Sequence, residues 1–299
     1  MAVHPSQEPP GADAIAAGAA GCAGLLTLVR DRVDAALMAR LPDLRAIANY
    51  GVGYDNIDVA EATRRGIVVT NTPDVLTAAT ADLALALILA VTRRVGEGER
   101  LVRSGEPWAW APDMMLGLEL DGATLGIVGM GRIGMAVARR AVGFGMKLIY
   151  QSRSPHADAN AMGARRVELD ELLRTADVVT LHCALTAETR HLIDAAALGR
   201  MKSTAYLVNT ARGPVVDEAA LAHALREGRI AGAGLDVYER EPAVEPALLE
   251  LDNVVLLPHL GSATTRARSE MSRVAASNLV AALTGERPPN PVNPEVLEG

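Results

Sequence analysis

A glycine-rich turn between an expected strand and an expected helix is the first stretch with chemical meaning. The apolar run Leu125–Val128 is typical of a buried parallel strand, and residues 135–142 are typical of a helix. Between them stands Gly129-Met130-Gly131-Arg132-Ile133-Gly134. Such glycines permit a tight turn, a close approach of the backbone to a pyrophosphate and close packing of helix on strand. The pattern alone is weak, but its flanking strand and helix favour a dinucleotide-binding site.

The end of the next expected strand indicates which dinucleotide binds. An Asp or Glu about 20 residues past the glycine turn would accept hydrogen bonds from the ribose 2′-hydroxyl of NAD. The segment Leu148–Ser154 contains no carboxylate there. Ser152 can donate to a 2′-phosphate, and Arg153 can pair with it through its planar guanidinium. We therefore predict a preference for NADP(H), with NAD(H) possible; the alternative is that Arg153 is an ordinary solvated cation.

Polar residues also follow three strands expected in the second half of the chain. They lie in the segments Val208–Gly213, Gly234–Pro242 and Leu257–Thr264. Ligands of a doubly wound parallel sheet bind at the carboxyl ends of its strands. We therefore expect these three loops to lie beside the bound dinucleotide.

These loops, with Asn49–Asp58, Thr70–Leu76 and the glycine turn, resemble the D-isomer-specific 2-hydroxyacid dehydrogenases. The resemblance runs from about Gly24 to the C-terminus and is strongest to the glyoxylate and hydroxypyruvate reductase branch. It implies an oxidoreductase that reduces small 2-keto acids to D-2-hydroxy acids by hydride transfer from NADPH.

The resemblance implies catalytic roles for Arg212, Glu241 and His259. Arg212 would bind the substrate carboxylate and carbonyl oxygen, which suits a permanently charged, forked guanidinium. His259 would donate a proton to the carbonyl oxygen, while Glu241 orients the ring and stabilises the imidazolium. Glu239 is the alternative glutamate. A structural role is the usual interpretation of a single histidine, and it is the one we give to the other five: His4, His156, His182, His191 and His223.

Further contacts are expected around these groups. The resemblance implies that Asp236 contacts the nicotinamide carboxamide, and we add Thr80, Thr210 and Gly261 as cofactor contacts. The backbone N–H groups of Gly51-Val52-Gly53 are expected to bind the substrate carboxylate, with a plain turn as the alternative. Substrate would then be held from two domains, whose closure excludes water.

The elements that would position these residues alternate between strands and helices. This alternation predicts an α/β chain with two doubly wound, Rossmann-like domains built on parallel sheets. We place a substrate-binding domain at residues 1–88 and 273–299, and a dinucleotide-binding domain at residues 89–272. One long helix is expected from Thr77 to about Arg103, and residues 1–24 show no periodic apolar pattern.

Two features depart from the family pattern. Family members usually carry a further strand and helix before the region matching Gly24, so we expect a first domain shortened at its N-terminus, with an exposed sheet edge. Ala184 stands where the family commonly has Pro, in a loop beside the cofactor.

Composition excludes several other classes of protein. A chain of 299 residues with 49% apolar and 22% charged residues is a globular chain long enough for two domains. A net charge of -7 provides no electrostatic footprint for nucleic acid or an anionic membrane. Cys22 and Cys183 lack the spacing of a disulfide framework or zinc site, so we predict no metal. Without a signal peptide or spanning segment, the cytoplasm is the expected location.

Quaternary structure and substrate remain open from the sequence. The family resemblance implies a homodimer joined through the dinucleotide-binding domains. Trp108 and Trp110, with Met114 and Met115, occupy an expected loop that either covers substrate or packs at a subunit interface. The alternative functions are an NAD-linked dehydrogenase of another 2-hydroxy acid, such as 3-phosphoglycerate, and a dinucleotide-sensing, corepressor-like binding protein.

Overall fold

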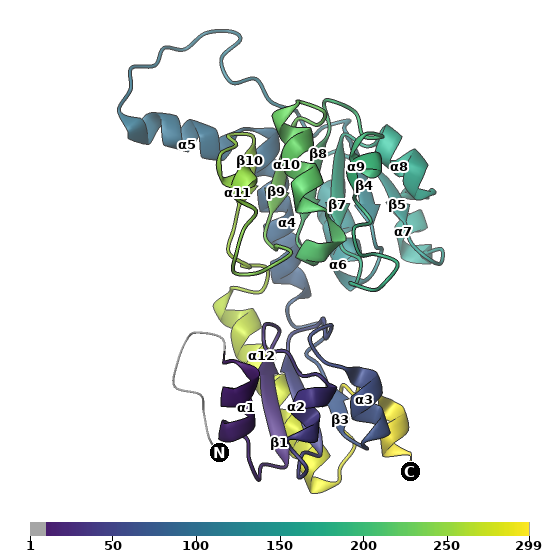
Figure 1. The fold of residues 1–299 in the computed structure, drawn as a ribbon. Helices are drawn as coiled ribbons and strands as arrows, with labels where there is room; N and C mark the ends of the chain where they lie inside the picture. Colours follow the sequence, from purple (N-terminus) through teal and green to yellow (C-terminus); the bar gives the residue numbers. More distant parts are fainter. Residues whose placement is uncertain (1–9, 299) are drawn as a thin grey trace. The chain divides into compact units, whose positions relative to one another are not determined.

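The computed structural model describes residues 10–298 and divides the chain into two compact units (Figure 1). One comprises the chain up to Leu76 together with the segment from Ala263, and the other runs from Thr77 to Ser262. The boundaries expected from the sequence, 88/89 and 272/273, fall inside helices α4 and α12. A helix moves as one body, so each of these two belongs wholly to one unit.

The unit from Thr77 to Ser262 is built on a seven-stranded sheet in the order β10-β9-β8-β7-β4-β5-β6. Every pair of neighbouring strands is parallel. The carboxyl ends of all seven strands therefore meet at one edge. The strands are β4 (Thr124–Val128), β5 (Lys147–Gln151), β6 (Arg165–Arg166), β7 (Val178–Leu181), β8 (Tyr206–Asn209), β9 (Gly232–Leu235) and β10 (Val254–Leu256).

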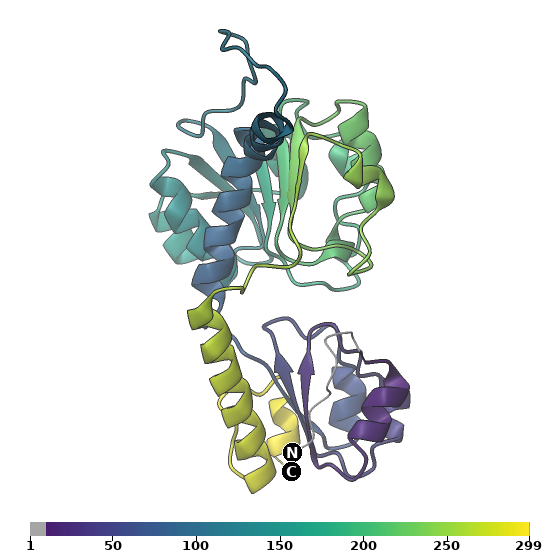
Figure 2. The ribbon, with the colours of Figure 1, turned by 90° about the vertical axis from the view of Figure 1, so that its left-hand side faces the viewer.

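Helices cover both faces of this sheet (Figure 2). One core holds Leu87 and Ile88 of α4 with Val137 of α6, and the other holds Leu172 of α8 with Leu221 of α10. The helices of this unit are α4 (Thr77–Thr92), α5 (Val95–Ser104), α6 (Arg132–Val142), α7 (Ala157–Ala161), α8 (Leu169–Thr175), α9 (Ala195–Leu198), the 3₁₀ turn η1 (Gly213–Val215), α10 (Glu218–Arg226) and α11 (Pro246–Leu249).

The other unit is built on a three-stranded parallel sheet in the order β1-β2-β3. Ile15, Leu37 and Met38 of its short helices share one core with Ile47 of β2, while α12 packs on the strands. β1 is an edge strand, and Leu26 on it is 46% exposed. The elements are α1 (Ala12–Gly18), β1 (Gly24–Leu28), α2 (Ala35–Ala39), β2 (Ala46–Tyr50), α3 (Val59–Arg64), β3 (Val68–Thr70), α12 (Thr265–Thr284) and the 3₁₀ turn η2 (Pro294–Leu297).

Side-chain caps explain where several helices begin. At each of five helix starts an Asp or Thr accepts a hydrogen bond from a backbone N–H of the first turn, which otherwise lacks a partner. These residues are Asp34 for α2, Asp58 for α3, Asp194 for α9, Asp217 for α10 and Thr264 for α12.

The predicted α/β class with parallel sheets is confirmed, but two local expectations are wrong. Within residues 1–24, where no regular structure was expected, Ala12–Gly18 forms α1 with Ile15 buried; residues 1–9 lie outside the described chain. The helix expected from Thr77 to Arg103 is two helices, since Arg94 takes the left-handed conformation (φ 52°). Its guanidinium pairs with Glu97 in the first turn of α5.

No helix within residues 10–298 has the length and apolar character needed to cross a bilayer.

Candidate active site

The glycine-rich turn joins β4 to α6. Gly129 has a φ of 95°, and a side chain there would meet the backbone of Cys183 at 2.6 Å. A side chain at Gly134 would collide with the carbonyl oxygen of Gly129, so the helix lies directly against the turn. Gly131, at the start of α6, is different: a Cβ there would have no atom within 4 Å.

The open space beside Gly131 lies where α6 presents its first N–H groups. No side chain caps this helix, so its N-terminal donors remain available to an anion. Met130 is buried, Ile133 is half-buried and Arg132 is exposed. The residues present therefore fit the pyrophosphate of a dinucleotide.

Two arginines and a serine meet just beyond the end of β5. The Ser152 hydroxyl donates to the Ser154 carbonyl at 2.5 Å, and Arg153 is exposed. Arg166 of β6 donates from Nε to the Ser152 carbonyl (3.0 Å) and from Nη2 to the Arg153 carbonyl (3.3 Å). The sequence interpretation missed Arg166, because only the pairing of β6 with β5 brings it here.

The loop after β8 holds Arg212 through an asparagine. The Asn209 side chain donates to the Arg212 carbonyl at 2.9 Å and accepts from the Ala211 N–H at 3.0 Å. The Arg212 guanidinium donates from Nη1 to the Ala211 carbonyl at 2.9 Å. Thr210, 8% exposed, lies 3.5 Å from Nδ1 of His182 through its hydroxyl.

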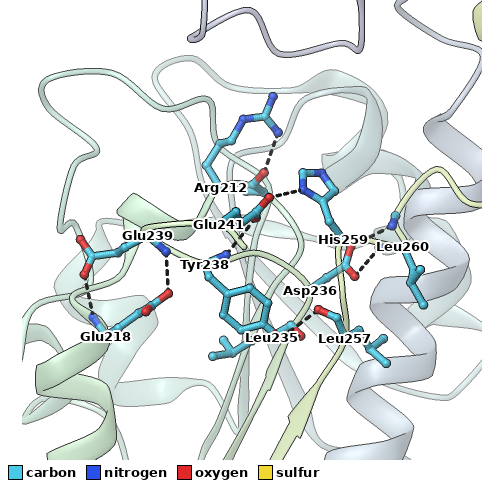
Figure 3. A network of polar contacts seen from close by, with 12 residues as sticks. Arg212, Glu218, Leu235, Asp236, Tyr238, Glu239, Glu241, Leu257, His259 and Leu260 are labelled. Atoms are coloured by element: carbon cyan, nitrogen blue, oxygen red, sulfur yellow. Dashed lines mark hydrogen bonds and ion pairs between the residues drawn. The ribbon is translucent and has the colours of Figure 1, made fainter. Parts of the chain in front are cut away.

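Glu241 and His259 form a direct pair beside Arg212 (Figure 3). Oε2 of Glu241 lies 2.8 Å from Nδ1 of His259, and each side chain is 33% exposed. Burial acts to raise the pKa of Glu241, but the hydrogen bond and charge of His259, the Tyr238 N–H and the charge of Arg212 together hold it below the usual value of a glutamate. Glu241 is therefore ionised throughout the neutral range and can orient the imidazole through Nδ1.

Asp236 supports the turn that carries His259. It is 1% exposed, and its carboxylate accepts the N–H groups of Leu260 (2.6 Å) and Gly261 (2.8 Å). Its own carbonyl accepts the His259 N–H at 2.9 Å. Burial raises the pKa of Asp236, against the lowering effect of these N–H groups and of His259.

The turn held by Asp236 is strained. His259 has a φ of 55°, a conformation that is uncommon outside glycine and persists only where surrounding contacts hold it. The Thr80 hydroxyl adds a contact by donating to the Gly261 carbonyl at 3.1 Å. The hydrogen bond between Thr80 and Gly261 thus stabilises the turn. Contacts of Thr80, Gly261 and Asp236 with the cofactor remain predictions.

The other histidines near this edge have different surroundings. Desolvation lowers the pKa of His182 to about 3, so it is neutral at physiological pH. His191 Nε2 lies 2.5 Å from Oε1 of Glu239, the alternative glutamate, which therefore contacts a different histidine from Glu241. Among the described histidines, His259 is the one paired with Glu241 beside Arg212.

The segment Gly51-Val52-Gly53 follows β2 in the unit that contains the N-terminal strands. Its three carbonyls accept hydrogen bonds from the Thr72 N–H, the Asn71 side chain and the Asn49 side chain. For the N–H groups of Val52 and Gly53, no acceptor lies in hydrogen-bonding geometry among residues 10–298. A side chain at Gly51 would collide with Val29. The turn is thus tightly built, and its N–H donors are available to a carboxylate.

Three of the predicted residues, Arg212, Glu241 and His259, come together on the loops after β8, β9 and β10, which are neighbours in the sheet. No group of three His, Cys, Asp or Glu side chains suited to a metal ion occurs in the described part of the chain.

Known proteins of one family resemble this chain in sequence. The family model for the D-isomer specific 2-hydroxyacid dehydrogenase, NAD binding domain, matches residues 85–261. A glyoxylate reductase of Thermococcus litoralis is 56% identical over 279 residues, which cover 91% of this chain and 84% of the relative. A glyoxylate reductase of Pyrococcus furiosus is 55% identical, over 92% of this chain and 83% of the relative.

Solved structures agree in fold over most of the chain. The TT0316 protein from Thermus thermophilus has a TM-score of 0.88 and 50% identity, covering 94% of this chain and 89% of that one. The NADPH-dependent glyoxylate/hydroxypyruvate reductase of Sinorhizobium meliloti, in complex with NADP and malonate, has a TM-score of 0.85 and 38% identity, with coverage of 94% and 87%.

The geometry of the glycine turn predicts different effects for two alanine substitutions, one on binding and one on stability. Gly131→Ala should leave the thermal unfolding midpoint unchanged, because its methyl group enters open space, yet weaken NADP⁺ binding by at least about tenfold, or 1.4 kcal/mol. Gly134→Ala should lower the midpoint, because its methyl group collides with the Gly129 carbonyl. Calorimetric titration and thermal unfolding measure both. Unchanged NADP⁺ affinity in Gly131→Ala would rule out a pyrophosphate beside this residue.

Proposed function

Because the chain belongs to the D-isomer specific 2-hydroxyacid dehydrogenase family, we propose that it reduces small 2-keto acids, such as glyoxylate and hydroxypyruvate, to D-2-hydroxy acids with NADPH. The observation that carries the proposal is the 2.8 Å contact between Glu241 and His259, beside Arg212. The sheet is parallel, so these groups lie at the same edge as the glycine turn. The names of the relatives, glyoxylate reductase, support the substrate class.

Each residue at this edge has a separate role in the proposed reaction. The bound dinucleotide supplies a hydride to the carbonyl carbon of the keto acid. Arg212 binds the carboxylate and the carbonyl oxygen and so fixes the substrate for that transfer. His259 donates its Nε2 proton to the carbonyl oxygen as the hydride arrives, since Nδ1 is taken by Glu241. Glu241 balances the imidazolium charge, and the ring regains its proton from solvent.

The donors after β2 keep their predicted role as a carboxylate-binding group. The N–H groups of Val52 and Gly53 bind the substrate carboxylate in this proposal, supported by the absence of an acceptor for them in the described chain. Two backbone donors suit a planar carboxylate, and they add no side chain that would limit the size of the substrate.

Turnover tests this function directly. The protein should oxidise NADPH with glyoxylate and hydroxypyruvate, and His259→Gln should lower kcat by about 10²–10⁴-fold without changing NADP⁺ affinity, because only proton donation is lost. His223→Gln, an exposed histidine of α10, is the matched control. Since the pKa of Glu241 is lowered from its usual value, its protonation should cost no rate in the neutral range.

Pyruvate and phosphohydroxypyruvate complete the substrate panel. Turnover of phosphohydroxypyruvate alone would replace the proposed substrate class with a phosphorylated one. Tight NADP⁺ binding without turnover of any 2-keto acid would contradict an enzymatic function and favour a dinucleotide-sensing protein.

We propose that NADP(H) is preferred over NAD(H) because of the cations beyond β5. Arg153 is exposed at the end of the strand where the adenosine ribose binds in this fold. Arg166 donates hydrogen bonds to the carbonyls of Ser152 and Arg153 and so places a second guanidinium beside them. Two arginines and a serine hydroxyl suit a 2′-phosphate, which carries close to two negative charges.

Substitution of neighbouring arginines tests the cofactor preference. Arg153→Ala and Arg166→Ala should each weaken NADP⁺ binding by about tenfold and leave NAD⁺ binding unchanged, since only NADP⁺ carries the 2′-phosphate. Arg165→Ala is the control, because Arg165 pairs with Glu171 instead. Equal losses for the two dinucleotides would show that the arginines shape the loop without contacting the phosphate.

We also propose a homodimer formed through α5 and the loop after it. α5 has no buried residue, and Val95 and Val102 lie on one of its faces at 55% and 63% exposure. The loop adds Trp108 and Trp110, 56% and 79% exposed. Large apolar side chains that are exposed along one helix face and in the loop that follows it are typical of an interaction surface.

Sedimentation velocity tests the dimer. The protein should sediment as a dimer at micromolar concentration, and Val102→Glu or Trp110→Glu should shift it to the monomer, since a charge cannot be buried there without a partner. Leu249→Glu, at a residue of α11 that is 64% exposed, should leave the dimer intact. A monomeric wild-type protein would refute the proposal.

A further inference from the structure

Tyr238 lies between the catalytic segments and contacts each of them (Figure 3). Its backbone N–H donates to Oε1 of Glu241 at 3.0 Å, the carboxylate oxygen that does not face His259. Glu241 is thus held through both oxygens, one by the imidazole and one by Tyr238.

The phenol of Tyr238 connects this loop to the segment after β10 that carries His259. Its hydroxyl donates to the Leu257 carbonyl at 2.9 Å, two residues before His259. Burial, and then the charge of Asp236, raise the pKa of Tyr238 to about 12. The hydroxyl therefore remains a donor at every pH at which the protein would work.

The backbone of Tyr238 also limits the Arg212 loop. A Cβ at Gly213 would collide with the carbonyl group of Tyr238 and the N–H of Glu239, so the two chains are in direct contact. Gly213 follows Arg212 immediately, and its lack of a side chain permits this approach. All three loops therefore meet at one residue.

A buried carboxylate anchors the loop on its other side. Glu218, the first residue of α10, is 3% exposed and accepts the Glu239 N–H at 2.6 Å. It also accepts a hydrogen bond from the backbone of Glu245. These two contacts lie on either side of Glu241 in the sequence and close the turn that carries it.

We propose that Tyr238 is a positioning residue of the reaction. Its hydroxyl and its backbone fix the relative positions of the segments that carry Arg212, Glu241 and His259, and Glu218 anchors the loop of Tyr238. The reason is geometric. Proton and hydride must reach one carbonyl group together, and a displacement of about 1 Å can lower such a rate up to about 100-fold. This inference rests on the proposed function, because its kinetic consequence requires turnover.

Tyr238→Phe removes only the hydroxyl and tests this role. We expect kcat for 2-keto acid reduction to fall by about tenfold, with NADP⁺ affinity unchanged. Glu218→Gln, which loosens the anchor without altering Tyr238, should also lower kcat while NADP⁺ affinity stays unchanged.

Tyr150→Phe is the matched control. Tyr150 is buried as well, at 0% exposure against 7% for Tyr238, and its hydroxyl bonds Asn160 and the His156 N–H, away from the catalytic loops. It should lower the thermal midpoint about as much as Tyr238→Phe while keeping kcat at saturating coenzyme. Equal losses of kcat in the two variants, or an unchanged kcat in Tyr238→Phe, would overturn the proposal.

Amide hydrogen exchange provides a measurement that does not depend on turnover. In Tyr238→Phe, exchange should accelerate in residues 236–245 and 257–262 together, and in Tyr150→Phe it should not. If the wild-type protein reduces no 2-keto acid, the proposed function fails, and exchange still decides whether Tyr238 couples the loops. Unchanged exchange in both segments would refute the coupling.

Discussion

Parallel pairing of seven strands is the constraint on which the rest of the site depends. It brings the carboxyl ends of β4, β8, β9 and β10 to one edge, although more than 100 residues separate the first from the last. The loops there can differ freely in sequence, because the backbone ladder and the apolar cores on both faces fix the ends of the strands. The glycine turn and the pair of Glu241 and His259 therefore share one edge as a direct result of topology.

Side-chain contacts to the backbone turn this common edge into a defined geometry. Asp236 holds a strained turn at His259, Asn209 closes the turn at Arg212, and Glu218 closes the turn at Glu241. Each of these groups is almost completely buried. The side chains of the candidate site are consequently held by rigid, desolvated supports, while Glu241 and His259 remain partly accessible themselves.

Much of this was predictable from residue types and order. The strand–glycine–helix pattern predicted the turn at Gly129–Gly134, and the residues after each strand located three candidate loops, within which the family resemblance indicated Arg212, Glu241 and His259. The supports were not predictable, because Arg166, Glu218 and Tyr238 are ordinary residues until strand pairing and loop contacts bring them to the site. The break at Arg94 was missed because neither glycine nor proline stands at that position, and an arginine seldom takes the left-handed conformation that ends the helix there.

The buried carboxylate of Asp236 also has a thermodynamic consequence. Its folded-state pKa lies above the value of an exposed aspartate, so its ionised form at neutral pH is less favourable in the folded protein than in the unfolded chain. Folding is therefore opposed by this group at neutral pH, and the opposition disappears as the pH falls through the raised pKa. The desolvation of the carboxylate that holds the turn at His259 therefore lowers the free energy of unfolding at neutral pH.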